Sequence, residues 1–467
     1  MKFTFKIIGF DKKFIESLFI PREHPWDMVP TKKKQPQTHL AYTPNGMNLG
    51  AHTGWGTLLF TSSRACDLSC DGCWTEATPE TIRKQLKSGA EWLYDGTFGI
   101  DVLESILKTF SDKQGKLVAC MSDGEPLVPA NYPFTRALAR ASGNQDLPFL
   151  LFTNGQSLDG KRLAELDKDT RGRISYSISM QTGLKERYGQ FMLSQPAAQQ
   201  RGERLFEQIE GNMETWKAYN RRFMSEHGDH GIGIHTYILP DKTTSDDMES
   251  IKTIVERLGQ APWTVSAMGA PTLAQPQGSS STQRSGNSHE SRDLASRYST
   301  GPTATISLGK GEEHKLCAYI AHGSYPSEEA KGPSGITFNP YLRGQVQTCP
   351  YHSMIGTSQW FALRDYLDAI QKSRVSITAG HISGWLSTAV TIETMITKAA
   401  FDVAGYEHCL MRHSRKNEID RFILGVNAHM GALLKDERLT PEREDYFSRL
   451  MDCLEKAISS YKTAPPQ

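Results

Sequence analysis

Short apolar runs that alternate with helical patterns constrain the fold of this chain more than any other feature. Six such runs lie between residues 56 and 270, and each is bounded by Gly, Pro, Asp or Asn, as buried parallel strands are. They cover residues 57–61, 117–121, 147–152, 174–180, 232–239 and 263–268. Strands that alternate with helices predict a parallel sheet with right-handed crossovers, in the form of an open barrel or a strongly curved sheet.

Three of the intervals between these runs carry an apolar stripe at helical spacing. The stripes lie at residues 100–110, 205–216 and 248–258, and Gly259 stands where the last of these helices is expected to end. A further amphipathic helix is expected at residues 441–461.

Composition divides the chain and excludes some classes of protein. A chain of 467 residues predicts two or three domains, and a net charge of +1 argues against a general nucleic-acid or membrane-surface role. No run of about 18 apolar residues and no signal-peptide pattern is present, so a cytoplasmic protein is expected. Changes in composition predict an N-terminal extension, a barrel, a Ser- and Gly-rich linker or loop, and a C-terminal domain, at residues 1–55, 56–270, 271–305 and 306–467.

Three of the eight cysteines lie close together after the first predicted strand. Cys66, Cys70 and Cys73 should share the loop at the carboxyl end of that strand, where parallel α/β barrels build their active sites. In a reducing compartment, clustered thiols indicate a metal site more often than disulfides. Three thiolates can hold three irons of a [4Fe–4S] cluster and leave the fourth iron open. The alternative is a zinc site with a distant fourth ligand.

The spacing Cys-x3-Cys-x2-Cys, followed by Trp74, resembles the radical S-adenosylmethionine (SAM) superfamily. Later motifs follow in the order that this family shows. Ser122-Asp123-Gly124-Glu125-Pro126 resembles the Gly-Gly-Glu-Pro motif that binds the SAM amino group, with Asp123 in place of the first Gly. After the third predicted strand, Thr153-Asn154-Gly155 resembles the Thr-Asn-Gly motif of the family.

Polar residues mark the fourth and fifth predicted strands. Ser177, Ser179 and Gln181 alternate along one strand and therefore point to one face. Polar side chains inside a barrel are costly unless they meet a polar ligand or a water-filled mouth. The resemblance implies that this strand contacts the SAM ribose and carboxylate and that the next strand, with His235, flanks the adenine. It thus implies a SAM site formed by Ser122, Asp123, Gly124, Glu125, Asn154, Ser177, Ser179, Gln181 and His235.

A second group of cysteines lies in the C-terminal part. Residues 335–350 have the pattern of a hairpin that ends at Cys349, which resembles the hairpin of SPASM and twitch extensions. This resemblance implies an auxiliary iron–sulfur cluster held by Cys317, Cys349 and Cys409. The alternative is an extension without a cluster, in which these thiols are ordinary buried residues.

Together, the resemblances imply an α/β fold, a partial (β/α)6 radical SAM barrel with a C-terminal α+β extension. They imply reductive cleavage of SAM to a 5′-deoxyadenosyl radical, with flavodoxin or ferredoxin as the reductant, and hydrogen abstraction from a peptide or small-molecule substrate. Peptide, protein or natural-product maturation is the favoured role. Nucleoside or RNA modification is an alternative within enzymes, although the neutral charge disfavours nucleic acid. A non-catalytic iron–sulfur redox protein is the alternative from another class, and it predicts no SAM site.

Overall fold

A computed structural model describes the central part of the chain and two shorter C-terminal segments. It covers residues 57–61, 65–68, 70, 99–112, 115, 117–121, 124–193, 198–239, 242–267, 298, 335–339, 344–347, 363–372, 374, 376–386 and 389. Within these residues, no helix is long and apolar enough to span a membrane.

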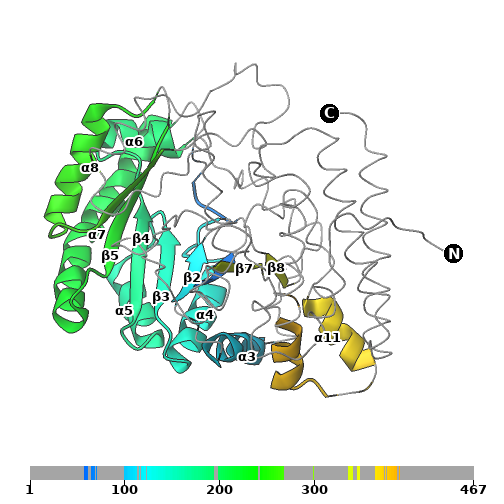
Figure 1. The fold of residues 1–467 in the computed structure, drawn as a ribbon. Helices are drawn as coiled ribbons and strands as arrows, with labels where there is room; N and C mark the ends of the chain where they lie inside the picture. Colours follow the sequence, from blue (N-terminus) through cyan, green and yellow to red (C-terminus); the bar gives the residue numbers. More distant parts are fainter. Residues whose placement is uncertain are drawn as a thin grey trace, which may run out of the picture.

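A single sheet organises the described residues, in the strand order β6-β5-β4-β3-β2-β1-β7-β8 (Figure 1). Its strands are β1 (Thr57–Thr61), β2 (Leu117–Met121), β3 (Phe149–Thr153), β4 (Ile174–Ser179), β5 (Ile232–Ile238), β6 (Trp263–Ala267), β7 (Gly335–Asn339) and β8 (Gln345–Gln347). Strands β1 to β6 pair with their sequence neighbours in parallel. The predicted α/β fold is therefore confirmed, and each of the six expected strands lies within two residues of its predicted bounds.

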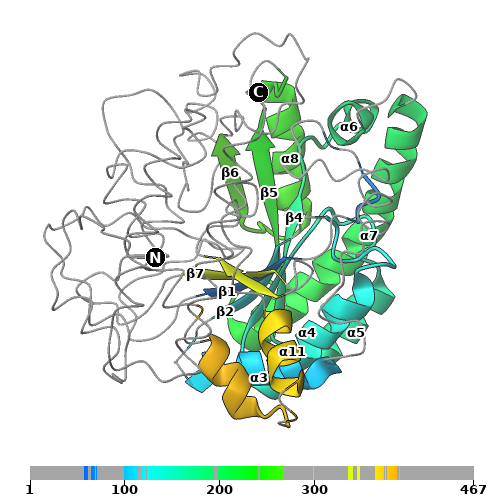
Figure 2. The same cartoon turned by 90° about the vertical axis from the view of Figure 1, so that its right-hand side faces the viewer.

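Helices connect these parallel strands. They are α3 (Gly99–Asp112), α4 (Tyr132–Asn144), α5 (Gly160–Asp169), α6 (Lys185–Met192), α7 (Ala198–His227) and α8 (Ser245–Arg257). Three of the four predicted helices correspond to α3, α7 and α8, and the fourth, at residues 441–461, lies outside the described residues. The sequence pattern did not predict α4, α5 and α6. Figure 2 shows α4, α5, α7 and α8 on the same side of the sheet.

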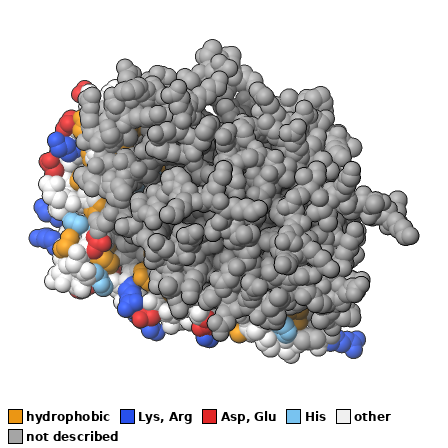
Figure 3. All heavy atoms as spheres, in the orientation of Figure 1, with side chains coloured by type: hydrophobic (Ala, Val, Ile, Leu, Met, Phe, Trp, Pro, Cys, Tyr) orange, Lys and Arg blue, Asp and Glu red, His pale blue; other side chains and the backbone are white. Residues whose placement is uncertain are grey.

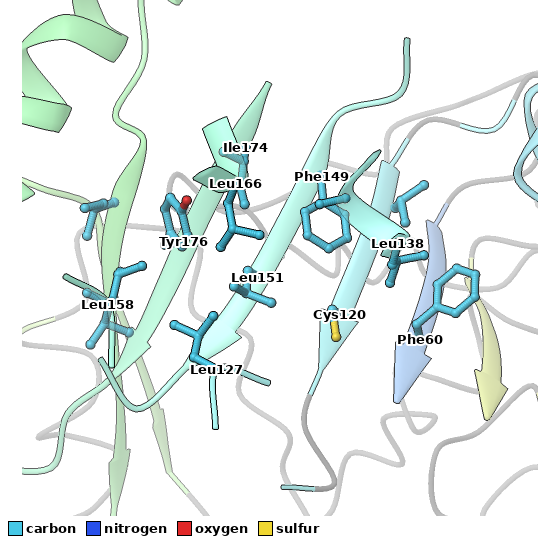
Figure 4. Close-up of a cluster of buried hydrophobic side chains, with 14 of the residues drawn as sticks. Phe60, Cys120, Leu127, Leu138, Phe149, Leu151, Leu158, Leu166, Ile174 and Tyr176 are labelled. Atoms are coloured by element: carbon cyan, nitrogen blue, oxygen red, sulfur yellow. The ribbon is translucent and has the colours of Figure 1, made fainter. Parts of the chain in front are cut away.

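The two faces of the sheet carry different side chains because residues alternate along each strand. On one face, Phe60, Cys120, Leu151 and Tyr176 join apolar side chains of the helices in one large buried core (Figure 4). The opposite face, here called the inner face, carries a small buried cluster of strand residues only: Leu59, Leu117, Ala119, Leu150 and Phe152. The helices therefore cover one face of the sheet. The inner face extends across β4 and β5, where every second residue points to it.

The predicted hairpin at residues 335–350 is present as β7 and β8, which pair antiparallel. It belongs to the same sheet, since β7 pairs in parallel with β1. The rings of Phe60 and Phe338 meet edge to face, with their centroids 5.3 Å apart. Helix α11 (Leu363–Lys372) begins beside Gly344, whose carbonyl accepts a hydrogen bond from the Leu363 N–H at 2.9 Å.

Charges of both signs lie on the surface of the described part. Where its side chains reach the surface in Figure 3, Lys and Arg alternate with Asp and Glu. Several of the ion pairs have both side chains exposed, and pairs of this kind contribute little to stability.

Candidate functional site

The loop after β1 holds two of the three clustered cysteines. Cys66 and Cys70 are both half-buried and pack against the large core. The Leu68 N–H donates to Cys66 Sγ at 3.5 Å, and Cys70 Sγ lies 3.8 Å from Met192 Sδ. Burial raises the pKa of the Cys66 thiol, and the nearby Glu125 carboxylate raises it further. Cys73 lies outside the described residues.

The turn after β2 is bonded directly to this cysteine loop. The Glu125 N–H donates to the Ala65 carbonyl at 2.7 Å. Asn131, which is fully buried, donates through Nδ2 to the carbonyls of Ala65, at 3.2 Å, and Glu125, at 2.8 Å. One amide side chain therefore fastens the two loops together. The neighbouring site candidates Ser122 and Asp123 lie outside the described residues.

The Glu125 carboxylate forms the centre of the site. It is 2% exposed and accepts three hydrogen bonds. Oε1 accepts from the Leu127 N–H at 3.1 Å and from Thr153 Oγ1 at 2.7 Å, while Oε2 accepts from the Asn154 N–H at 2.7 Å. Burial raises the pKa of Glu125 to about 7, and the hydrogen bonds from Asn154, Thr153 and Leu127 oppose that rise.

The turn after β3 extends this network back to the cysteine loop. Asn154 donates through Nδ2 to Asp67 Oδ1 at 2.8 Å, and its own Oδ1 accepts from the Gln156 N–H at 2.9 Å. Asp67 Oδ1 lies 3.9 Å from Cys66 Sγ. The loops that follow β1, β2 and β3 are thus joined by hydrogen bonds at the carboxyl edge of the sheet. Parallel α/β sheets bind their ligands at this edge.

The polar residues of β4 and β5 lie on the inner face. Ile174, Tyr176 and Ile178 belong to the helix-covered core, so the alternating Ser177 and Ser179 point the other way. Ser177 is buried and Ser179 is half-buried. Across the inner face, the apolar cluster of β1 to β3 therefore gives way to hydroxyl groups on β4.

His235 lies next to Ser179 in the strand pairing and is 2% exposed. Its ring centroid lies 4.2 Å from that of Tyr237. Burial lowers the pKa of His235 to about 4, so the imidazole is neutral at neutral pH. Gln181 Oε1 accepts from the Tyr237 N–H at 3.0 Å, which ties the end of β4 to β5 and leaves the Gln181 amide NH2 as a donor.

The structure brings together Cys66, Cys70, Glu125 and Asn154, while Ser177, Ser179, Gln181 and His235 lie along the neighbouring strands of the same sheet. Cys317, Cys349 and Cys409 lie outside the described residues, so the auxiliary cluster stays a prediction. Within the described residues, no group of three or more His, Cys, Asp or Glu side chains forms a metal site.

Three further residues contribute to the site and were not predicted as members of it: Asp67, Thr153 and Asn131. Asp67 follows Cys66 and Thr153 precedes Asn154, so their positions in the sequence motifs could have identified both as members of the site. Asn131 lies on the segment before α4, and nothing in its local sequence marks it.

No protein-family model and no curated protein sequence matches the chain. Among solved structures, it is similar to SuiB of Streptococcus suis bound to S-adenosylmethionine, with 15% identity and a TM-score of 0.38, over 64% of this chain and 61% of SuiB. It is also similar to SuiB bound to its precursor peptide SuiA, with 14% identity and a TM-score of 0.41, over 67% of this chain and 64% of SuiB. The matched part therefore spans less than two thirds of SuiB.

Proposed function

We propose that the chain is a radical SAM enzyme, in which Cys66, Cys70 and Cys73 hold a [4Fe–4S] cluster. One observation supports this most strongly. The cysteine loop, the Gly124-Glu125 turn and the Asn154-Gly155 turn are hydrogen-bonded to one another at the carboxyl edge of a parallel sheet. These are the three segments that the family resemblance marks for the cluster and for SAM.

The residues present fit such a cluster. Iron–sulfur clusters take thiolate ligands, and hydrogen bonds to the sulfurs tune them. Cys66 and Cys70 offer two thiols on one short loop, and the Leu68 N–H already points at one of the sulfurs. Ala65 and Leu68 are buried beside them, which anchors the loop on the core. The third thiol, Cys73, follows Cys70 by three positions.

When bound, the cluster would supply one electron to SAM, whose sulfonium C–S bond would break to give methionine and a 5′-deoxyadenosyl radical. The Glu125 carboxylate would bind the ammonium group of SAM in a charge-assisted hydrogen bond. In the described part of the chain, Glu125 Oε2 accepts a hydrogen bond from the Asn154 N–H, and a carboxylate oxygen can accept more than one such bond.

The polar half of the inner face would bind the rest of SAM. Ser177, Ser179 and the Gln181 amide offer hydroxyl and NH2 groups for the ribose and the carboxylate. The neutral His235 ring would flank the adenine. Hydrogen bonds between SAM and these side chains would offset the free-energy cost of burying polar groups.

The apolar half of the inner face supports a role in holding the substrate. Leu59, Ala119, Leu150 and Phe152 are each at most 8% exposed and carry no polar side-chain group. Such a surface excludes water from radical chemistry. We propose a peptide or a natural product as the substrate, and flavodoxin or ferredoxin as the electron donor.

The test is anaerobic purification followed by assays of iron and of SAM cleavage with dithionite. Wild-type protein should be brown, carry at least about four irons per chain and release 5′-deoxyadenosine. The triple variant with Ala at Cys66, Cys70 and Cys73 should lose the cleavage. Cys120→Ala is the matched control, because Cys120 is fully buried on the helix-covered face and should leave cleavage intact. A colourless zinc protein, or 5′-deoxyadenosine from the triple variant, would refute the proposal.

A further inference from the structure

Two distant segments of the chain hold Asp67, the residue between Cys66 and Leu68. From the turn after β3, Asn154 Nδ2 donates to Asp67 Oδ1 at 2.8 Å. From the first turns of α7, an Arg201 guanidinium nitrogen donates to the Asp67 carbonyl at 3.1 Å. The side chain and the backbone of one residue in the cysteine loop are therefore both anchored from outside that loop.

Asn154 is itself held in place. Its N–H donates to Glu125 Oε2 at 2.7 Å, and its Oδ1 accepts from the Gln156 N–H at 2.9 Å. With both ends of its side chain and its backbone N–H bonded, Asn154 has little freedom to turn. It connects the Asp67 carboxylate on one side with the Glu125 carboxylate on the other.

We infer that Asp67 is a positioning residue, which locks the cysteine loop to the Asn154 turn and so sets the separation between the metal-binding thiols and Glu125. The role of this lock in positioning the cluster rests on the proposed function. The hydrogen bond between Asp67 and Asn154 that forms the lock is present in the metal-free chain. A cluster and a SAM molecule must meet within bonding distance, so the two loops that hold them need a fixed separation.

Substitutions at position 67 separate the lock from the negative charge. Asp67→Asn removes the charge but keeps an oxygen that can accept from Asn154 Nδ2. Asp67→Ala removes both the charge and the acceptor. Asn154→Ala removes the donor and leaves the Asp67 charge in place. The double variant completes a cycle that isolates the Asp67–Asn154 contact from the other bonds of Asn154.

The first measurement is made on the metal-free full chain, by the rate at which iodoacetamide alkylates each thiol, mapped by mass spectrometry. In Asp67→Ala, Cys66 and Cys70 should be alkylated roughly 5-fold faster than in Asp67→Asn, as the loss of one neutral hydrogen bond of about 1 kcal/mol predicts. Asn154→Ala should speed alkylation of the same two thiols, and the double variant should add little to either single change. The buried Cys120 is the internal control, and Asp112→Ala, at an exposed position on α3, is the matched variant.

Equal alkylation rates in Asp67→Ala and Asp67→Asn, or additive effects in the cycle, would overturn the inference. Circular dichroism at the assay temperature shows whether each variant is folded. If Asp67→Ala does not fold, the comparison between Asn154→Ala and wild type decides, and an unchanged rate then overturns the inference.

The second measurement uses iron-loaded protein, and its readout is the change that SAM causes in the electron paramagnetic resonance spectrum of the reduced cluster. Asp67→Ala should bind iron yet show a diminished change, whereas Asp67→Asn should keep the wild-type response. The same response in both variants would overturn the positioning role. If wild type binds no cluster, the proposed function fails, and the alkylation test still decides whether the lock exists.

Discussion

Gly155 follows Asn154 at a point where no side chain fits. Its φ is +77°, and a Cβ added there would lie 3.0 Å from both Ile178 Cγ2 and Trp216 Cη2. Trp216 cannot easily move away, since it is fully buried and its indole N–H donates to the Leu158 carbonyl at 2.8 Å. We therefore predict that Gly155→Ala destabilises the protein through both the backbone and the packing.

The two contributions can be separated with Gly172. That residue has nearly the same φ, +78°, but nothing lies within 4 Å of an added Cβ. Gly172→Ala should therefore cost only the left-handed backbone conformation, about 1–2 kcal/mol. Gly155→Ala adds overpacking in a filled core, about 1–3 kcal/mol, so its total should reach about 2–5 kcal/mol.

Urea unfolding followed by tryptophan fluorescence measures both variants, and the midpoints are compared with a common slope. Trp216, whose ring lies beside Gly155, is one of the eight tryptophans that contribute to this signal. Gly155→Ala should unfold at a lower urea concentration than Gly172→Ala, and both should unfold before wild type. Equal losses in the two variants would show that the core accommodates the added methyl group, and the packing argument would then be wrong.

Two further predictions concern acid stability and the C-terminal thiols. Burial lowers the pKa of His235 in the folded state to about 4, whereas the pKa of an ordinary histidine is about 6.5. As the pH falls below 6.5, His235 therefore takes up a proton in the unfolded chain before it does so in the folded protein. The free energy of unfolding should fall by about 3 kcal/mol between about pH 6.5 and pH 4. The raised pKa of Glu125 changes stability in the opposite direction, so the contribution of His235 must be isolated by a variant. The test compares the unfolding free energies of wild type and His235→Gln at pH 7 and at pH 5. If both proteins lose the same free energy between these two pH values, the prediction is wrong. If an auxiliary cluster exists, the triple Cys66/Cys70/Cys73 variant should retain roughly four irons and broad visible absorption, and an iron-free but folded triple variant would rule that cluster out.

The strands could be predicted because each is an apolar run with polar or Gly and Pro boundaries. Three helices could not, for identifiable reasons. In α4 the buried face consists largely of small residues such as Ala137 and Ala141, so the apolar period is weak. Helix α6 has only eight residues, too few for a clear period. In α5 only Leu163 and Leu166 are buried, and the helix is recognisable mainly by its cap, Asp159, which accepts from the Arg162 N–H.

Part of the site could be read from motifs, because Glu125 and Asn154 stand at fixed places after their strands. Their contacts could not be read in the same way. The bond between Asn154 and Asp67 joins residues 87 positions apart and depends on β1, β2 and β3 lying side by side. The pairing of β7 with β1 could not be predicted either, because a hairpin pattern predicts that its own two strands pair and does not show which other strand they join.

The pairing of β1 with β7 affects how the protein folds while it is synthesised on the ribosome. Strand β1 is made first of the eight, yet one of its two neighbours, β7, is made after all the other parallel strands. Until then, Phe60 lacks the ring of Phe338 and one edge of β1 lacks its parallel partner. An unpaired strand edge is a template for wrong pairing, so the nascent chain passes through a long interval in which its first strand is open to other chains. Release of a chain truncated before residue 335 should therefore yield a protein prone to association through β1.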